Sequence, residues 1–176
     1  MVLAMEWIDV LTAAGAPAGT RKTKADVHRD GDWHRAAHLW IVHRDGRVLL
    51  QKRAAVKENW PGKWDVSVAG HVAVGEDAMT AAVREAREEI GLAVDRGALA
   101  QIGTVREQCV LNGGAYVDNE IHEIFLLCCD IDLAALTLDP LEVGEVALAA
   151  PDQLDRFDLV PHPEEYAILR RHLQSC

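Results

Sequence analysis

The sequence is poor in features that define particular classes of protein. Four of its 176 residues are cysteines (Cys109, Cys128, Cys129 and Cys176), and phenylalanine and tyrosine occur twice each. The cysteines show no metal-ligand spacing, so we expect reduced thiols and no cysteine-based metal site. No apolar run approaches the length of a membrane-spanning helix, and residues 1–16 lack the basic start and apolar centre of a signal peptide. These absences predict a cytoplasmic protein that does not insert into membranes.

Basic residues are scarce relative to acidic ones. The chain has 18 lysines and arginines against 28 aspartates and glutamates, which gives a formal net charge of −10. This balance argues against binding to a nucleic-acid duplex or an anionic membrane. An acidic protein can still bind a small polyanion when metal ions supply the local positive charge. The length and the 49% hydrophobic composition predict one domain over residues 1–176.

The most informative stretch is residues 70–92, GHVAVGEDAMTAAVREAREEIGL. A turn at Gly75 and the acidic pair Glu76–Asp77 predict the start of a helix, and Gly91 predicts its end. Four apolar residues recur at helical spacing and predict a buried stripe: Met79, Val83, Ala86 and Ile90. The stretch is therefore typical of a loop followed by one amphipathic helix.

Three glutamates share another face of this predicted helix. Glu85, Glu88 and Glu89 fall within an arc of roughly 100°. Clustered like charges destabilise a helix, whereas Mg²⁺ or Mn²⁺ prefers several carboxylate oxygens. Arg84 precedes Glu88 by four residues, a spacing at which it can orient that glutamate. A solvated acidic face is the simpler interpretation of the Glu–Glu pair alone, so the wider pattern has to decide.

That wider pattern resembles the signature of a known family. Gly70, five residues, Glu76, seven residues and then REAREEIGL from Arg84 to Leu92 match every fixed position of the Nudix box. The resemblance to Nudix hydrolases implies the Nudix fold, an α/β/α sandwich with a mixed β-sheet. It also implies cleavage of a small-molecule diphosphate, either a nucleoside diphosphate linked to another moiety X or a related compound.

The same resemblance implies roles for individual residues. It implies that Mg²⁺ or Mn²⁺ binds Glu85, Glu88 and Glu89, with the Gly70 carbonyl as a frequent further ligand. Glu76 would then support the loop, and Arg84 would orient the glutamates. A glutamate would act as the general base, and Glu85 is the first choice.

Outside the box, hydrophobic patterns predict a mixed sheet between helices. We expect an N-terminal hairpin over about 6–24 and a loop over 26–35. The predicted strands cover residues 36–42, 47–50, 64–69, 99–105, 106–111, 120–129 and 141–149. Helices are expected from Pro151 and over 164–174. This pattern also predicts an α/β/α sandwich.

Three further segments resemble the branch related to isopentenyl-diphosphate isomerase: VHRDGDWHRAAHLWIVHRDGRVLLQKR, WPGKWDVSVAGHV and DNEIHEIFL. Those isomerases hold a divalent metal with three histidines and two acidic residues. By position, the resemblance assigns these ligands to His28, His34, His71, Asp118 and Glu120. The spacing from His28 to His34 is one residue shorter than in the isomerases, and surface histidines in a loop are the alternative interpretation. Glu120 is also a candidate to complete the metal shell of the box.

One position argues against isomerisation. The isomerases use a cysteine just before the box glycine, and this chain has Ala69 there, whose methyl group cannot transfer a proton. The intact box favours hydrolysis, with an isomerase-like enzyme and a non-catalytic diphosphate sensor as alternatives.

The substrate is less well defined by the sequence. Lys52, Arg53 and Lys63 are candidates to bind phosphate, although solvated charges are an equal alternative. Glu142 and Glu145 are further candidates for a base, with a solvated strand edge as the alternative. Four tryptophans surround the same segments and suit core packing or a ring of the substrate: Trp33, Trp40, Trp60 and Trp64. The oligomeric state stays open, with a homodimer among the options.

Overall fold

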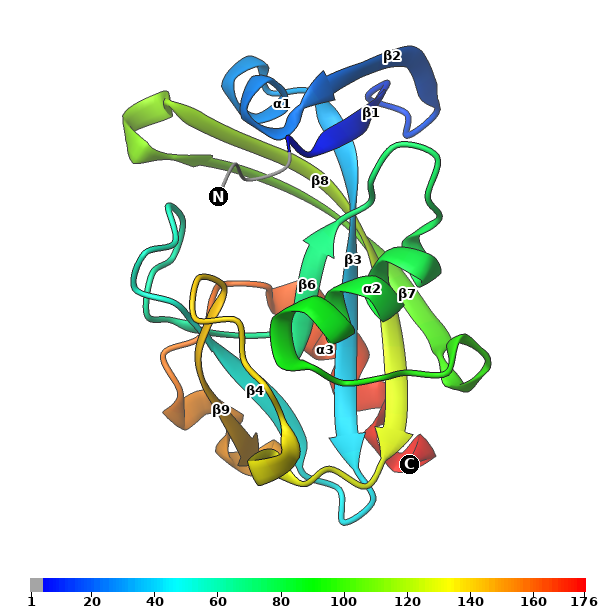
Figure 1. Cartoon of the computed structure of the whole chain (residues 1–176), viewed down its shortest axis with the longest axis vertical. Coiled ribbons are helices and arrows are strands. Elements are labelled where there is room, and N and C mark those ends of the chain that lie inside the picture. The colour runs from blue at the N-terminus through cyan, green and yellow to red at the C-terminus, as the bar shows by residue number, and fades with distance from the viewer. Residues whose placement is uncertain (1–4) are drawn as a thin grey trace.

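Strand β3 (Trp33–His43) occupies the centre of a nine-stranded mixed sheet in the computed structural model, which describes residues 5–176. The other strands are β1 (Trp7–Leu11), β2 (Pro17–Thr23), β4 (Val48–Arg53), β5 (Trp64–Asp65), β6 (Val68–His71), β7 (Ala100–Leu111), β8 (Tyr116–Cys129) and β9 (Val143–Ala149). The α-helices are α1 (Lys24–Asp30), α2 (Ala78–Ile90) and α3 (Pro163–His172). Figure 1 shows α1 and the β1–β2 hairpin above one end of β3.

Two pairings of β3 place the segments that matter for function. It runs parallel to β8, from the Trp33–Asn119 pair to the His43–Cys129 pair. It runs antiparallel to β6, from Ala36–His71 to Leu39–Val68. Strands β4 and β9 continue the sheet beyond one part of β3, and β7 pairs with β8. Residues far apart in the sequence therefore meet around β3.

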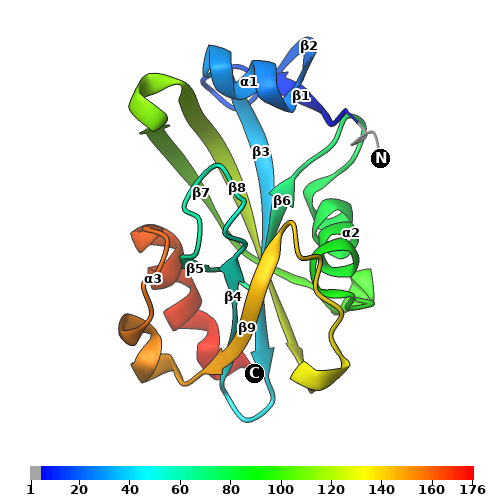
Figure 2. The same cartoon turned by 60° about the vertical axis from the view of Figure 1, so that its left-hand side comes forward.

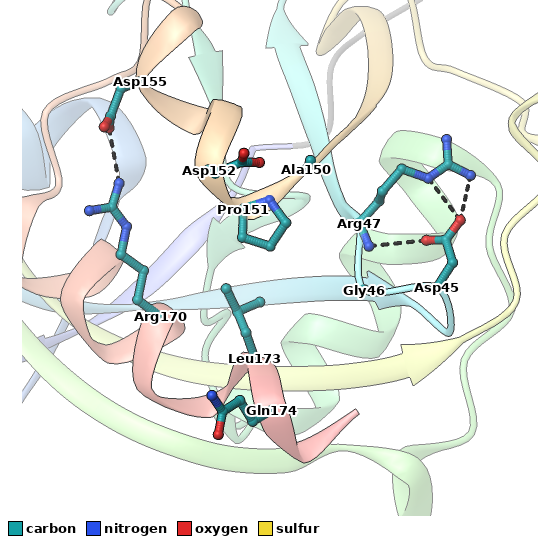
Figure 3. Close-up of a pocket in the computed structure, with 10 residues that line it drawn as sticks. All are labelled: Asp45, Gly46, Arg47, Ala150, Pro151, Asp152, Asp155, Arg170, Leu173 and Gln174. Atoms are coloured by element: carbon teal, nitrogen blue, oxygen red, sulfur yellow. Dashed lines mark hydrogen bonds and ion pairs between the residues drawn. The ribbon is translucent and has the colours of Figure 1, made fainter.

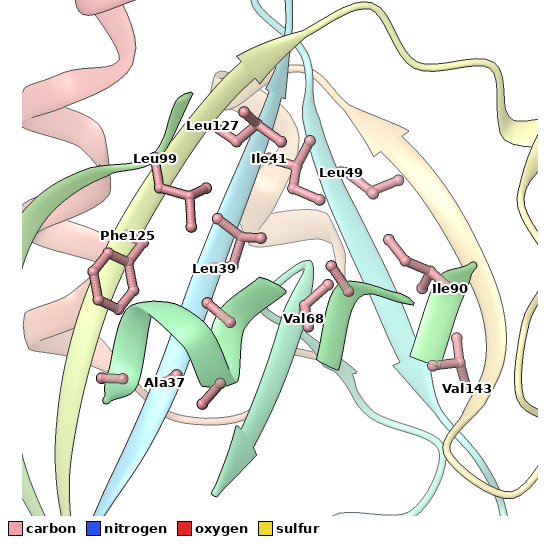
Figure 4. Packing of buried hydrophobic residues seen from close by; sticks show 14 of the residues in the cluster. Ala37, Leu39, Ile41, Leu49, Val68, Ile90, Leu99, Phe125, Leu127 and Val143 are labelled. Atoms are coloured by element: carbon pink, nitrogen blue, oxygen red, sulfur yellow. The ribbon is translucent and has the colours of Figure 1, made fainter. Parts of the chain in front are cut away.

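Two apolar layers cover opposite faces of this sheet. Side chains alternate along a strand, so Leu39 and Ile41 pack under α2, whereas Trp40 packs on the other face with Leu169 of α3. Figure 4 shows the cluster on the α2 face, and Figure 2 shows α2 and α3 on opposite sides of the sheet. The predicted α/β/α sandwich is confirmed.

Helix α2 has the ends that its sequence predicts. Asp77 is the N-cap, and its carboxylate accepts a hydrogen bond from Thr80 N at 2.8 Å. Gly91 ends the helix in the left-handed conformation at φ 70°, where glycine is favoured. The predicted stripe faces the core: Ala86 and Ile90 are buried, and Met79 and Val83 are partly buried.

The prediction of a loop over residues 26–35 is wrong. Helix α1 begins after Thr23, whose hydroxyl accepts a hydrogen bond from Asp26 N, and it ends at Gly31. It has one buried apolar residue, Val27, which packs against two residues of β1. A single apolar residue produces no periodicity in the sequence, so tertiary contacts determine this helix.

Two other boundaries also differ from the predictions. The strands expected over 99–105 and 106–111 form one continuous strand, β7, with a register shift between Gln101 and Gly103. The helix expected from Pro151 is a 3₁₀ helix over Pro151–Arg156. The predicted hairpin near the N-terminus is confirmed by the antiparallel pairing of β1 and β2.

The expectation of reduced thiols is wrong for two of the four cysteines. Cys128 and Cys176 form a disulfide with their Cα atoms 5.5 Å apart, whereas Cys109 and Cys129 are free. Cys128 packs on the α3 face of β8 and Cys129 on the α2 face, so only Cys128 faces the C-terminal segment. Disulfides are uncommon in a reducing cytoplasm, so this disulfide counts against the predicted cytoplasmic location. Within residues 5–176, no helix is long and apolar enough to span a bilayer.

This disulfide is expected to be visible in a thiol titration. Purified protein unfolded without reductant should expose two reactive thiols, from Cys109 and Cys129, and four after reduction. Because the bond closes a segment of 48 residues, Cys176→Ser should lower the free energy of unfolding by up to about 4 kcal/mol. Cys129→Ser is the matched control and should leave the disulfide intact. Four thiols before reduction would contradict the pairing.

Candidate functional site

Helix α2 presents its three glutamates in different environments. Glu85 and Glu89 are 8% and 5% exposed, whereas the side chain of Glu88 is 58% exposed. Both buried glutamates point toward β6, the strand that pairs with β3. Two of the three predicted carboxylates therefore lie between α2 and β6, and only Glu88 is mostly exposed to solvent.

Gly70 allows Glu85 to lie directly against the backbone of β6. A Cβ atom at Gly70 would lie 2.2 Å from the carboxyl carbon of Glu85, so a side chain at this position would force the Glu85 carboxylate to move. Gly70 is thus required by this close approach rather than by an unusual backbone conformation. The structure brings the Gly70 backbone and the Glu85 carboxylate together, as the box resemblance implies.

Arg84 connects the box residues through five hydrogen bonds. Its Nε and Nη2 each donate to a Glu76 oxygen at 3.0 Å, and Nη2 also donates to the carbonyl of His71. Its Nη1 donates to Glu85 Oε1 at 2.6 Å and to Glu88 Oε2 at 3.0 Å. Glu76 in turn accepts a hydrogen bond from Ala73 N. Arg84 therefore holds two box glutamates and the preceding loop in one arrangement.

Burial sets the protonation of the inner glutamates. It raises the pKa of Glu85 to about 7, although the nearby Arg84 opposes the shift. Burial and the Glu85 charge raise the pKa of Glu89 well above its usual value. Glu89 accepts hydrogen bonds from Gln51 Nε2 at 3.1 Å and Ala69 N at 3.3 Å. Glu85 therefore changes charge near neutral pH, where a general base is most effective.

This arrangement fits a hard divalent ion. The box supplies carboxylate oxygens. Because Gly70 has no side chain, the backbone of β6 lies directly beside Glu85. The three carboxylates do not converge as one tight group, because Arg84 bridges two of them and Glu89 bonds to β6. Within residues 5–176, the groups of ligand atoms that lie within 4.8 Å of one another all contain histidines.

One such group contains four of the residues assigned by the isomerase resemblance: His28, His34, His71 and Glu120. The β3–β8 register places His34 opposite Glu120, and their Nε2 and Oε1 atoms lie 3.1 Å apart. His71 Nε2 lies 3.3 Å from the same oxygen. The structure brings these residues together, so the interpretation as surface histidines in a loop is wrong for them.

Helix α1 supplies the remaining histidine of this group. His28 is 2% exposed, and its Nε2 lies 3.3 Å from Asp118 Oδ1. Neither of these two buried atoms has a hydrogen-bond partner. Between His28 and His34, Gly31 ends α1 in the left-handed conformation at φ 69°. Two unpaired buried atoms at one point are what a metal ligand pair shows without its ion.

Glu120 stays ionised despite its burial. Burial opposes ionisation, but hydrogen bonds from His122, His34 and His71 lower the pKa of Glu120 well below its usual value. Burial alone would lower the pKa of His71, but the contacts with Glu120 and Glu6 outweigh burial and raise that pKa. The structure therefore groups Glu120 with the histidines. Gly70 and His71 are neighbours in β6, so the His71 side chain points away from the face on which Glu85 lies against Gly70.

The predicted phosphate-binding residues already contact polar groups of the protein. Arg53 bonds to Asp65 at 3.1 Å and to the Asn59 carbonyl. Lys63 pairs with Asp158 at 2.5 Å. Each cation already has an acidic or carbonyl partner, so phosphate binding by these residues stays a prediction.

The other predicted residues near the substrate are also engaged. Lys52 lies 3.6 Å from Glu145, and Glu142 pairs with Lys57. Trp40 is fully buried in the core. The roles proposed for Glu142 and Glu145 therefore stay predictions as well.

One cavity in the described part of the chain lies outside the box. It has a volume of about 680 Å³ and lies between the β3–β4 turn and the C-terminal segment. Figure 3 shows two ion pairs among its charged residues, Asp45 with Arg47 and Asp155 with Arg170. No residue of the box or of the histidine group lines it. This cavity therefore does not locate the functional site.

Sequence reasoning missed a second buried group, formed by His38, His122 and Glu165. A histidine inside a continuous apolar strand is the signal that could have found it, since His38 interrupts the apolar run of β3. The pairing of His38 with Glu165 joins residues 127 positions apart, which local pattern does not reveal.

Comparisons with known proteins agree with the geometry of the box. A model of the NUDIX domain matches residues 32–170. The chain is similar to Nudix hydrolase 3 of Arabidopsis thaliana, with 39% identity over 158 residues that cover 88% of this chain and 20% of that protein. It thus spans one fifth of the length of that relative. It is also 33% identical to an isopentenyl-diphosphate Delta-isomerase of Streptomyces griseus, over 84% of this chain and 72% of that enzyme.

Solved structures show the same fold. A Deinococcus radiodurans protein superposes with a TM-score of 0.72 at 18% identity, over 94% of this chain and 98% of that one. The NUDIX domain of Shewanella oneidensis NrtR, complexed with ADP ribose, has a TM-score of 0.61 at 14% identity, over 79% and 87%.

Glu85→Gln is expected to stabilise the metal-free protein at alkaline pH. The folded-state pKa of Glu85 is about 7, against 4.5 for the unperturbed group. Ionisation therefore destabilises the folded state increasingly as pH rises from 4.5 to 7, and fully above that range. Removing the charge should raise the free energy of unfolding at pH 8 by on the order of 2 kcal/mol.

Urea unfolding in EDTA at pH 5 and pH 8 tests this expectation. The gain should largely vanish at pH 5, where the native carboxyl is protonated. Glu164→Gln, on the exposed face of α3, is the control and should show no such difference. An equal effect of Glu85→Gln at both pH values would show that ionisation of Glu85 does not destabilise the fold.

Proposed function

Because this chain belongs to the Nudix family, we propose that it is a metal-dependent hydrolase of a small organic diphosphate. The class of substrate is a nucleoside diphosphate linked to another moiety X, or a related diphosphate. The observation that carries the proposal is the close approach of Glu85 to Gly70 beneath an intact Arg84 network.

The box residues would have distinct roles in hydrolysis. Glu85, Glu88, Glu89 and the Gly70 carbonyl would hold Mg²⁺ or Mn²⁺. The ion would neutralise the diphosphate and make water more acidic. Arg84 keeps Glu85 and Glu88 oriented, and Glu76 anchors Arg84. Glu85 would accept a proton from the attacking water.

Ala69 separates this proposal from the isomerase alternative. The residue lies in β6 beside Gly70, and its methyl group packs on the α3 side of the sheet. A methyl group neither gives nor takes a proton, so this position cannot supply the acid–base step of an allylic isomerisation. Hydrolysis needs no group there, because the box glutamates lie on the other side of β6.

The histidine group favours a second metal ion. His28, His34, His71 and Glu120 place their ligand atoms within 4.8 Å of one another, and Asp118 contacts His28. Imidazole and carboxylate together suit Mn²⁺ or Zn²⁺ better than Mg²⁺. This group is also the specific observation that keeps an isomerase-like activity as the second candidate function.

A substrate screen tests the hydrolase proposal. Phosphate release should be measured with Mg²⁺ and with Mn²⁺ on nucleotide sugars, ADP-ribose, dinucleoside polyphosphates, coenzyme A, nucleoside triphosphates and isopentenyl diphosphate. One class of these compounds should be hydrolysed. Glu88→Gln should lower kcat at least 100-fold, which corresponds to a rise of roughly 3 kcal/mol in the activation free energy. Glu88 is exposed, so the variant is expected to fold normally.

Glu164→Gln is the matched control for this screen, because Glu164 is an exposed glutamate of α3. Allylic product with intact phosphates would replace the proposal by the isomerase alternative. Tight binding of one compound without turnover, unchanged in Glu88→Gln, would favour the sensor alternative.

The histidine group makes a separate prediction about metal content. His71→Gln should weaken Mn²⁺ binding at that group more than tenfold while leaving the box intact, since His71 contributes one of four ligand atoms. Isothermal titration of metal-stripped protein measures the number of sites. His43→Gln, a partly exposed histidine of β3 outside the group, is the control. Identical isotherms for both variants and the native chain would argue against a metal in this group.

A further inference from the structure

His122 of β8 lies between two carboxylates on the α3 face of the sheet. Its side chain is 1% exposed, and it separates Glu120, two residues earlier on β8, from Glu165 of α3, which is 0% exposed. His122 Nε2 is 2.9 Å from Glu120 Oε2, and His122 Nδ1 is 3.4 Å from Glu165 Oε2. Glu120 belongs to the histidine group described above, whereas His122 and Glu165 do not.

The two carboxylates also determine the charge of His122. Burial favours the neutral ring, but the contacts with Glu120 and Glu165 outweigh burial and raise the pKa of His122 to about 10. The charged ring has an N–H on each nitrogen, so one N–H is directed at each carboxylate. Hydrogen bonds between charged groups are stronger than those between neutral groups, so the ring is a firm donor to Glu120.

Helix α3 and strand β3 fix the position of this ring. Glu165 Oε1 accepts a hydrogen bond from Trp40 Nε1 at 2.8 Å, and Oε2 lies 2.8 Å from His38 Nδ1. The His38 ring stacks on the His122 ring, with centroids 4.0 Å apart and an angle of 26° between the planes. The Glu165 carboxylate and the stacked ring therefore restrict both the position and the plane of His122.

Glu120 divides its two oxygens between His122 and the histidine group. Oε2 contacts His122, whereas Oε1 lies 3.1 Å from His34 Nε2 and 3.3 Å from His71 Nε2. The last torsion of a glutamate side chain is broad, so a carboxylate without such a contact rotates easily. The hydrogen bond from His122 to Oε2 restricts this rotation and leaves Oε1 directed at the imidazole nitrogens.

Two histidines of the group are oriented by local backbone contacts instead. His28 Nδ1 is 2.7 Å from the Lys24 carbonyl oxygen, and His34 Nδ1 is 3.0 Å from the Asp32 carbonyl oxygen. Both carbonyls lie within four residues of the histidine that they contact. Glu120 differs from these histidines, because its orientation depends on a contact that continues from β8 to α3.

We propose that His122, held in place by Glu165 of α3, is a positioning residue that orients Glu120 for metal binding in the histidine group. The inference rests on the metal-binding role proposed above for that group. Partners that hydrogen-bond to a metal ligand orient it, and their loss weakens metal binding. Helix α3 therefore contributes to the histidine group without supplying a ligand to it.

Two substitutions of His122 separate this role from a purely structural one. The side-chain amide nitrogen of glutamine reaches the place of Nε2, whereas that of asparagine reaches the place of Nδ1. His122→Gln therefore keeps a donor for Glu120, and His122→Asn keeps a donor for Glu165 alone. A purely structural role would give the two variants similar properties, since each replaces the buried ring by an amide.

Titration of the full-length, metal-stripped chain with Mn²⁺ measures the consequence, in a Glu88→Gln background that weakens binding at the box. His122→Asn should weaken Mn²⁺ binding at the histidine group roughly 10- to 100-fold, and His122→Gln should weaken it much less. Equal losses of affinity in the two variants would overturn the proposal.

Spectra of the metal-free protein test the orientation of Glu120 directly. In EDTA, long-range ¹⁵N–¹H spectra of the imidazoles should show shifted Nε2 signals of His34 and His71 in His122→Asn and near-native signals in His122→Gln. Glu165→Gln should shift the same signals. Glu164→Gln, which changes the exposed neighbour of Glu165 on α3, is the matched control and should not shift them.

These spectra separate the proposal from the metal-binding role on which it rests. A background protein that binds no Mn²⁺ at the histidine group would contradict that role, and the metal-free spectra would still decide whether His122 orients Glu120. Unshifted His34 and His71 signals in folded His122→Asn would overturn the proposal. Where His122→Asn does not fold, unshifted signals in Glu165→Gln would overturn it.

Discussion

The contact between Glu85 and Gly70 is the constraint on which the rest of the candidate site depends. Helix α2 approaches β6 so closely at this point that any side chain on residue 70 would overlap the carboxylate. The approach is maintained by alanines of α2 packed on the sheet and by caps at both helix ends. It also buries Glu85, which raises the pKa of that carboxyl to about 7. The close packing of α2 on β6 therefore also determines the pKa of Glu85.

Strand alternation separates the remaining chemistry from this contact. Apolar residues of β3 such as Leu39 pack under α2, and the alternate positions carry His34, His38 and Trp40 toward the other face. The parallel register with β8 then brings Glu120 opposite His34, two residues before His122. One strand pair thus supplies side chains to two buried polar groups, which share the contact between Glu120 and His122.

Local signals in the sequence were enough to predict α2, its caps and the grouping of its glutamates, because helical period and end residues act within a few positions. The five isomerase-like residues also meet as their motifs imply. Helix α1 was missed because Val27 is held by β1, a contact that no periodicity reveals. The disulfide and the Glu165 cluster were missed because they join residues 48 and 127 positions apart. Such contacts follow from topology rather than from local pattern.

The balance between hydrolase and isomerase chemistry depends on which side of β6 the reacting groups occupy. Gly70 and His71 are adjacent, yet one faces Glu85 and the other faces Glu120. An isomerase needs a proton donor on the histidine side, where this chain has the methyl group of Ala69. The side that faces α2 carries the intact box: Glu85, the Arg84 that hydrogen-bonds to it and the exposed Glu88 beside them. The alanine at residue 69 therefore removes a proton donor from the histidine side of β6 and leaves the box side unchanged.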